Sequence, residues 1–166
     1  TLLKHFGALP LVAEDLGHIT PAVHALRERY GFPGMRVLQF AFDGGTDNPY
    51  LPHNHSVNSV VYTGTHDNDT TLAWFQGLTP DRQQYVFDYL GHPGEPMPQP
   101  LLRTALASVA RLAILPMQDV LMLGPGHRMN TPGTASGNWR WRFEWEQVTP
   151  DRIELLRRLV EVYGRG

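Results

Sequence analysis

Five residues near the middle of the chain, 65-THDND-69, combine a histidine, two aspartates and an asparagine directly after the apolar run 60-VVYTG-64. Another acidic residue, Glu14, follows the apolar stretch 9-LPLVA-13, where burial could keep its carboxyl group protonated near neutral pH. Glycosyl transfer needs such an acid to protonate the leaving oxygen, and further carboxylates to stabilise positive charge at the sugar carbon. Glu14 and Asp67 are therefore candidates for a carboxylate pair.

A metal site is the alternative interpretation of the same cluster. Imidazole and carboxylate groups close together suit zinc or iron, and 53-HNH-55 supplies two further histidines. If His66 and Asp67 lie at a strand end, however, their side chains point in opposite directions. Asp69 then suits the N-cap of a helix over 70-TTLAWFQ-76, and the two histidines fit a solvated loop. Because a metal site needs several convergent ligands, the sequence predicts no bound metal.

Helix boundaries are clearly marked along the chain. A Thr-Pro pair opens, and a glycine closes, each of three segments: 20-TPAVHALRERYG-31, 79-TPDRQQYVFDYLG-91 and 149-TPDRIELLRRLVEVYG-164. Threonine can accept a hydrogen bond as N-cap, proline suits the first helical position, and glycine adopts the left-handed conformation that ends a helix. Three helices are therefore predicted. Apolar residues at helical spacing predict a fourth over 101-LLRTALASVARL-112.

Apolar runs too short for helices lie between and around these segments. They are 9-LPLVAED-15, 36-RVLQFAFD-43, 58-NSVVYTG-64 and 112-LAILPMQDV-120. Continuous rather than alternating apolarity is typical of strands buried on both faces of a parallel sheet, with crossover helices covering it. The sequence thus predicts an α/β fold with about four parallel strands, in the order β-α-β-loop-β-α-α-β.

An acidic residue stands at or just after the end of each predicted strand: Glu14 or Asp15, Asp43, Asp67 and Asp119. Ligand sites of barrels and open α/β sheets assemble at the carboxyl ends of parallel strands, so four such acids are expected to converge on one face. Asp and Glu also cap turns and helices, and for any one of these acids that structural role is an equally good interpretation.

Composition favours one soluble domain in the cytoplasm. The 166 residues are 42% hydrophobic and 18% charged, which suits a globular protein rather than a disordered one. A net charge of -2 gives no electrostatic reason to bind nucleic acid. No apolar run reaches the roughly 18 residues of a membrane span, so no membrane partner is predicted. The absence of cysteine agrees with a reducing cytoplasm.

The segment 124-GPGHRMNTPGTASGNWRWRFEW-145 mixes glycine turns with Asn130, Trp139, Trp141 and several arginines. It does not match a phosphate-binding loop, because no Gly-Lys-Ser or Gly-Lys-Thr follows its glycines. A polar, aromatic loop beside an active-site face can hold sugars. It can equally be a structural closure in which the tryptophans fill the core.

Four blocks of the sequence resemble one enzyme family. They are 11-LVAEDLGHITPAV-23, 32-FPGMRVLQFAF-42, 62-YTGTHDNDTTLAWF-75 and 128-RMNTPGTASGNWRWR-142. In this order they are similar to the C-terminal part of the amylomaltases, the 4-α-glucanotransferases or disproportionating enzymes of the α-amylase clan. The resemblance implies that residues 1–166 form the second half of a (β/α)8 TIM barrel. It also implies α-1,4-glucans and maltooligosaccharides as partners, and no metal or organic cofactor.

The resemblance also implies roles for single residues. Glu14, in AEDLG, corresponds to the general acid/base, and Asp67, in THDND, to the aspartate that binds sugar hydroxyls and stabilises the transition state. His66 lies beside Asp67 as a hydrogen-bond donor. Phe40 corresponds to an aromatic residue on the acceptor side of the cleft, and Asn130 to a loop residue that contacts the glucan.

One expected part of the site does not occur in this sequence. The family carries its nucleophilic aspartate in an Arg-x-Asp-His segment before AEDLG, and the 166 residues contain no such segment. A complete barrel typically needs about 250 residues, and the chain opens on Thr1 rather than Met. We therefore expect a fragment that is inactive in isolation. A hydrolytic enzyme of the same clan and a non-catalytic glucan-binding fragment are the alternative functions.

Overall fold

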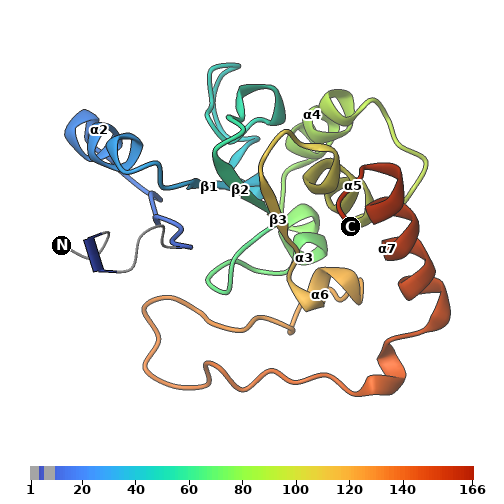
Figure 1. The fold of residues 1–166 in the computed structure, drawn as a ribbon. Helices are drawn as coiled ribbons and strands as arrows, with labels where there is room; N and C mark the ends of the chain where they lie inside the picture. Colours follow the sequence, from blue (N-terminus) through green and yellow to red (C-terminus); the bar gives the residue numbers. More distant parts are fainter. Residues whose placement is uncertain (1–3, 6–9) are drawn as a thin grey trace.

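A three-stranded parallel sheet forms the centre of the computed structural model, which describes residues 4–5 and 10–166 (Figure 1). The strands are β1 (Gly34–Val37), β2 (Ser59–Tyr62) and β3 (Leu112–Ile114), in that spatial order. Gly34 pairs with Ser59, and Val60 pairs with Leu112. The predicted α/β class and parallel pairing are confirmed.

Three of the four predicted strands exist, and each is shorter than its apolar run. After β1 the chain turns into the 3-10 helix η1 (Leu38–Phe40), which carries Leu38 into the core. The run that contains β3 is interrupted at Pro116, which cannot donate to a sheet ladder and instead precedes the short helix α6 (Met117–Val120). Apolar character therefore marks burial along these runs rather than strand alone.

The fourth predicted strand, over 9–15, is not found in the described part of that segment. Residue 9 lies outside the described residues, and residues 10–15 carry no strand. The Ala13 N–H donates to the carbonyl of Pro33 at 2.9 Å, but the N–H of Met35 donates to the Asp15 side chain at 2.6 Å. The Asp15 carboxylate thus accepts the hydrogen bond that a backbone carbonyl of a neighbouring strand would otherwise accept from Met35. The strand pairing stops there.

All four predicted helices are found, although the fourth ends at Ala107 rather than at residue 112. They are α2 (Pro21–Arg29), α4 (Pro80–Leu90), α5 (Gln99–Ala107) and α7 (Pro150–Val162). The three closing glycines have left-handed backbones, with φ of 67° at Gly31, 74° at Gly91 and 61° at Gly164.

The predicted capping hydrogen bonds are wrong. Thr20, Thr79 and Thr149 occupy the N-cap positions, but none of their side chains makes a capping hydrogen bond. At Thr149 the hydroxyl is engaged by the carboxylate of Asp151, whose pKa this hydrogen bond lowers. The backbone dihedral angles and the following proline are therefore what set these helix starts.

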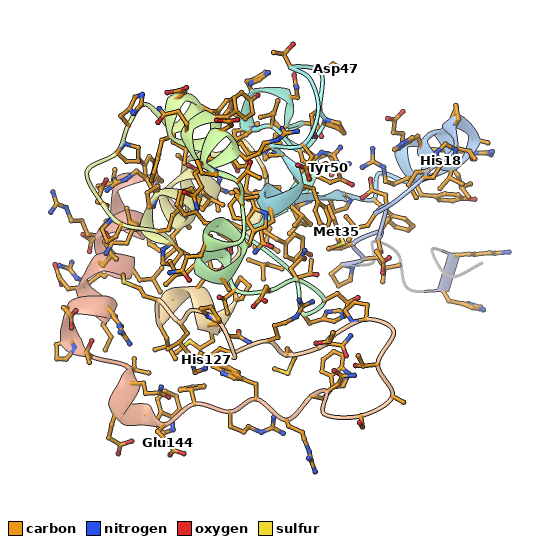
Figure 2. All side chains as sticks on the ribbon, turned by 180° about the vertical axis from the view of Figure 1, so that it is seen from behind. His18, Met35, Asp47, Tyr50, His127 and Glu144 are labelled. Carbon is orange, nitrogen blue, oxygen red and sulfur yellow. The ribbon has the colours of Figure 1, made fainter. Side chains whose placement is uncertain are left out.

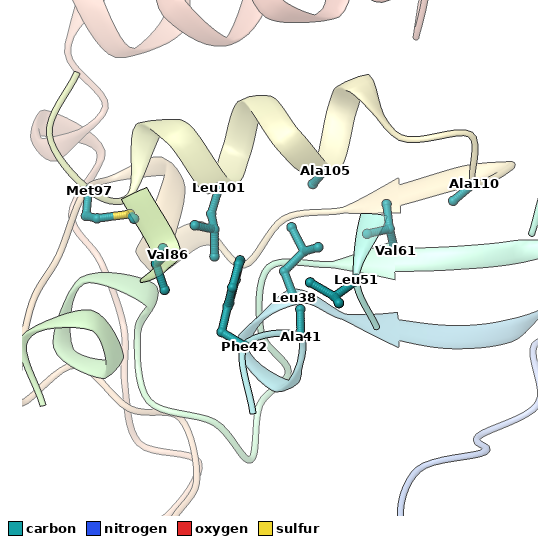
Figure 3. Close-up of a cluster of buried hydrophobic side chains, with 10 residues drawn as sticks. All are labelled: Leu38, Ala41, Phe42, Leu51, Val61, Val86, Met97, Leu101, Ala105 and Ala110. Carbon is teal, nitrogen blue, oxygen red and sulfur yellow. The ribbon is translucent and has the colours of Figure 1, made fainter. Parts of the chain in front are cut away.

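The main core lies between the sheet, α5 and α4 (Figure 3). Leu38, Val61 and Leu101 are fully buried there, and Phe42 packs edge-on against Tyr85 and Tyr89. A smaller cluster of Leu102, Leu106 and Leu159 joins α5 to α7. Among the described residues, no helix is long and apolar enough to cross a membrane.

Strand β3, which is three residues long, forms one edge of the sheet, and Leu112 is 47% and Ile114 41% exposed there. Unpaired strand edges with apolar side chains promote association between chains. We therefore expect residues 1–166, expressed alone, to self-associate, and Leu112→Lys to reduce the association. Mass in solution from light scattering after size exclusion measures both.

Val109→Lys is the matched control, because Val109 is also exposed, at 56%, but lies outside the strand. It should leave the association unchanged. A monodisperse monomer of residues 1–166 would show that this edge does not drive association.

Candidate active site

The carboxyl ends of the strands border a cavity of about 540 Å³. Glu14, the turn over 64–70, and the residues that follow β3 line it, together with part of the loop between α6 and α7. Met35 on β1 and His127 on that loop mark two of its sides (Figure 2). The structure thus brings Glu14 and Asp67 into one cavity, although 53 positions separate them (67 − 14).

The turn that carries His66 and Asp67 is built by its own side chains. Asn68 Oδ1 accepts from the backbone N–H of Thr65 at 2.9 Å and from the Thr65 hydroxyl at 2.8 Å. The N–H of Asn68 returns a bond to the carbonyl of Thr65 at 3.1 Å. Asn and Thr side chains favour such local closures, so THDND forms a compact turn at the end of β2.

His66 and Asp67 lie side by side, contrary to the prediction that they point in opposite directions. The strand ends at Tyr62, so the alternation of a strand no longer applies at residues 66 and 67. His66 Nε2 lies 3.3 Å from Asp67 Oδ1, and both side chains are about half exposed. An imidazole and a carboxylate are therefore presented together to the cavity.

The loop between α6 and α7 holds this turn through two residues. Asn130 donates from Nδ2 to Asp67 Oδ1 at 2.6 Å, and its backbone N–H donates to the carbonyl of His66 at 3.1 Å. Arg128 donates from Nη2 to the carbonyl of Asp67 at 2.8 Å. Asn130 thus contacts Asp67 directly, and its predicted contact with glucan stays a prediction.

Asp69 does not cap the following helix. The N-cap of α3 (Thr71–Gln76) is Thr70, whose hydroxyl accepts from the N–H of Ala73 at 3.2 Å. Asp69 instead accepts from the N–H of Thr70 at 2.9 Å and lies 3.6 Å from Arg128. The predicted N-cap was therefore one residue too early, and Asp69 joins the turn to the loop.

A buried polar cluster lies beneath the turn. Asp119 is 1% exposed and accepts three hydrogen bonds: from Thr63 Oγ1 at 2.5 Å, from Thr71 Oγ1 at 2.7 Å and from the Thr71 N–H at 2.8 Å. Burial raises the pKa of Asp119, and these hydrogen bonds partly oppose the rise. Gln39 adds a bond from Nε2 to the carbonyl of Asp69 at 3.0 Å.

Gln39 reaches this position because residue 64 is glycine. A Cβ at Gly64 would lie 2.5 Å from Gln39 Nε2, closer than side chains can approach. With Gln39 in this position, only glycine fits at residue 64, where the turn begins after β2.

Three of the four acids predicted to converge do line the cavity, but they differ in burial. Glu14 is exposed, Asp67 is half exposed and Asp119 is buried. Asp43 does not line the cavity, so that prediction is wrong for this acid. Its carbonyl accepts a hydrogen bond from Asn48, in the loop between η1 and β2.

The expected burial of Glu14 is not found either. In the segment before it, the N–H of Ala13 donates to Pro33, just before β1, and Leu11 and Val12 are each 43% exposed. Its neighbour Asp15 is the buried acid of the pair. Asp15 lies 3.2 Å from Arg27 and 3.7 Å from Arg36, and these contacts fix the backbone from which Glu14 projects.

Phe40 does not line the cavity. It is 36% exposed and packs edge-on against Tyr50, with ring centroids 5.5 Å apart. Arg128 and Trp139 do line it, and the resemblance assigned a role to neither of them. Trp139 packs against His66 with ring centroids 5.0 Å apart. Its place in a loop rich in arginine and aromatic residues was the only sequence signal for it.

The histidines of 53-HNH-55 take no part in the cavity. His53 contacts Tyr89 at 2.9 Å, and His55 is buried with Nε2 2.9 Å from the carbonyl of Tyr50. Burial lowers the pKa of the His55 imidazole. Within the described residues, no group of three or more histidine and acidic side chains is placed to hold a metal ion.

Sequence comparison identifies the family to which this chain belongs. A family profile described as 4-alpha-glucanotransferase matches residues 1–149. The chain belongs to the 4-alpha-glucanotransferase family. A 4-alpha-glucanotransferase of Thermus thermophilus is 51% identical over 168 residues, covering 96% of this chain and 34% of the relative. One from Synechocystis is 55% identical over 159 residues, covering 95% of this chain and 32% of the relative.

Solved structures give the same relationship. The amylomaltase from Streptococcus agalactiae, described in complex with acarbose, matches with a TM-score of 0.95 and 38% identity. That match covers 99% of this chain and 34% of the amylomaltase. The amylomaltase from Corynebacterium glutamicum shares the fold, with a TM-score of 0.61 at 17% identity. This glucanotransferase-family chain thus spans about a third of the length of its relatives.

Replacing Asp119 tests the cluster beneath the turn. Asp119→Ala leaves three buried donors without their acceptor, and each unsatisfied donor costs about 1–3 kcal/mol. We expect the free energy of unfolding of the natural protein to fall by at least about 2 kcal/mol in denaturant titration. Asp43→Ala, at an exposed acid, is the control and should change it little.

The pH dependence of the same site has a defined sign. Because the pKa of Asp119 is raised above 3.8, the folded protein holds this proton more tightly than the unfolded chain. Asp119 therefore contributes stability below pH 3.8 that is lost as pH rises through the raised pKa. Asp119→Asn cannot titrate, so natural protein should lose stability relative to this variant over that window. A difference in the free energy of unfolding between the two proteins that stays constant with pH would contradict this role of Asp119.

Proposed function

We propose that this chain supplies the acid/base and the transition-state-stabilising carboxylate of a 4-α-glucanotransferase. The enzyme transfers a segment of an α-1,4-glucan to the 4-hydroxyl of another glucan or of glucose, with retention of configuration. The observation that carries the proposal is the placement of Glu14 and Asp67 in one cavity, with Asp67 oriented by Asn130. Family membership supports it.

We further propose that residues 1–166 form the second half of a (β/α)8 barrel. Three parallel strands with intervening helices suit such a barrel, in which active sites lie at the carboxyl ends of the strands. The cavity lies at those ends. The close match to about a third of a larger amylomaltase supports the same interpretation.

The reaction takes place in two displacements. An aspartate nucleophile attacks the anomeric carbon while Glu14 gives its proton to the departing oxygen, so the glycosidic bond breaks as a glycosyl ester forms. Glu14, now a carboxylate, takes the proton of the incoming 4-hydroxyl, whose oxygen displaces the ester. In this family the nucleophile stands in an Arg-x-Asp-His segment, which these 166 residues do not contain. We therefore expect residues 1–166 alone to release no glucose from maltotriose.

Asp67 acts on the sugar at the cleavage point. Its Oδ1 accepts from Asn130, which leaves Oδ2 free of any hydrogen bond within the described residues to accept from sugar hydroxyls. Bonds that tighten as the sugar ring flattens lower the barrier, because only interactions stronger in the transition state accelerate the step. His66, beside it, donates to the same sugar.

Transfer rather than hydrolysis requires an acceptor site that holds sugar and excludes water. The loop over 124–145 is suited to this task because it forms one wall of the cavity. Phe40, on the acceptor side by resemblance, is the second candidate. The partners are α-1,4-glucans and maltooligosaccharides, and the acarbose in the Streptococcus agalactiae complex supports a sugar-binding cavity. None of these steps requires a metal or an organic cofactor.

Glu14→Gln tests the acid/base assignment in the natural protein, by which we mean the full-length protein that contains residues 1–166. Proton transfer by a positioned group contributes typically 10²–10⁴-fold, so we expect turnover of maltotriose to fall by about that range while glucan binding persists. Glu146→Gln, at an exposed glutamate outside the cavity, is the control. Turnover of Glu14→Gln within a few-fold of the natural protein would remove Glu14 from this role.

Asp67→Asn tests transition-state stabilisation. The amide keeps an oxygen for Asn130 but loses the negative charge, so kcat and kcat/KM for maltotriose should fall together. Asp43→Asn is the matched control at an acid outside the cavity. A raised KM with unchanged kcat would reduce Asp67 to a ground-state binding residue. Glucose accumulating without longer products in the natural protein would favour a hydrolase.

A further inference from the structure

Trp139 has an unusual backbone conformation. Its φ is 62°, and His92 and Met122 are the other non-glycine residues with positive φ in the described part of the chain. A bulky side chain in the left-handed region is strained and persists only when its surroundings impose it. Gly137, two residues earlier, also has a positive φ, of 85°, so the same loop uses glycine at one left-handed position and tryptophan at another.

The loop imposes the conformation of Trp139 from both sides. Its N–H donates to the carbonyl of Met129 at 2.7 Å, and its carbonyl accepts from Arg142 at 3.1 Å. The preceding residue, Asn138, accepts from the N–H of Thr131 at 2.9 Å. Residues 129–131 and 138–139 are thus tied together, and Asn130, one of the two residues that hold the turn of Asp67, lies within this segment.

Core packing does not account for this tryptophan. Trp139 is 55% exposed. Trp141, in contrast, is half-buried and donates from Nε1 to His127 at 3.2 Å. The reading of this loop as a closure with tryptophans filling the core is therefore wrong for Trp139. An exposed indole in a strained backbone, at the wall of a cavity, points to a ligand.

The residues around Trp139 indicate which kind of ligand could bind there. The indole packs against His66, whose imidazole contacts Asp67, so a flat apolar surface lies beside a carboxylate. A pyranose ring has the complementary form, with C–H groups on its face and hydroxyls around its rim. Binding sites of this kind combine an aromatic surface with a few polar groups that fix orientation.

We propose that Trp139 is a sugar-binding residue, whose indole stacks on a glucose ring of the α-1,4-glucan next to the ring held by Asp67. The inference rests on the proposed function and deepens it, because it assigns substrate positioning to a residue that the resemblance did not. The loop between α6 and α7 then does two things at once: Asn130 orients the carboxylate, and Trp139 binds the neighbouring sugar.

The test compares affinity with stability in the natural protein carrying Glu14→Gln, which suppresses turnover. Trp139→Gly and Trp139→Asn suit the left-handed backbone, so the free energy of unfolding should stay the same or rise. The dissociation constant for maltotriose, measured by calorimetry, should increase roughly tenfold. Trp139→Phe, which keeps an aromatic face, should lose less. Trp145→Ala, at a tryptophan that is 76% exposed and outside the cavity, should lose nothing.

Each outcome decides the matter. Unchanged affinity in both Trp139→Gly and Trp139→Asn would overturn the proposal, and so would unfolding of both, because Trp139 would then be structural. An equal loss in Trp145→Ala would also overturn it. If the protein with Glu14→Gln binds no maltotriose, the proposed function fails together with this inference. If it binds maltotriose through Trp139 while the natural protein shows no turnover, only the proposed activity fails.

Discussion

The buried carboxylate of Asp119 is the interaction on which the site depends. It stands on α6, after the third strand, and accepts from Thr63 at the end of β2 and from Thr71 at the start of α3. The turn that carries Asp67 therefore has both of its ends attached to the same group. A charge taken out of water is costly, and the three donors offset part of that cost, so the pKa of Asp119 is still raised.

Above this buried acid the site is held by polar contacts between loops. Arg128 and Asn130 bind the backbone and side chain of the turn, so two loops that are far apart in sequence behave as one surface. Mobile connections can carry chemistry when a rigid scaffold positions them. The difference in burial separates the two kinds of acid here: Asp119 and Asp15 hold the structure, while Asp67 and Glu14 face the cavity.

Local patterns predicted the helices well because their signals are short-range. Thr-Pro starts and glycine stops act within one turn of a helix, and α2, α4 and α7 begin and end within two residues of those marks. The strands were predicted less well. An apolar run such as 36–43 is buried throughout much of its length, yet only part of it pairs, because pairing depends on where neighbouring segments place their carbonyls.

The sequence by itself determined the family, the positions of the main helices and the residue types that follow the strands. Tertiary structure alone decided which acid is buried and which is exposed, since Asp119 and Thr71 are 48 positions apart and Asp67 and Asn130 are 63 apart. It also placed Trp139 against His66 and left Phe40 outside the cavity. Burial and hydrogen-bond partners arise from such distant contacts, and no periodicity or spacing along the chain encodes them.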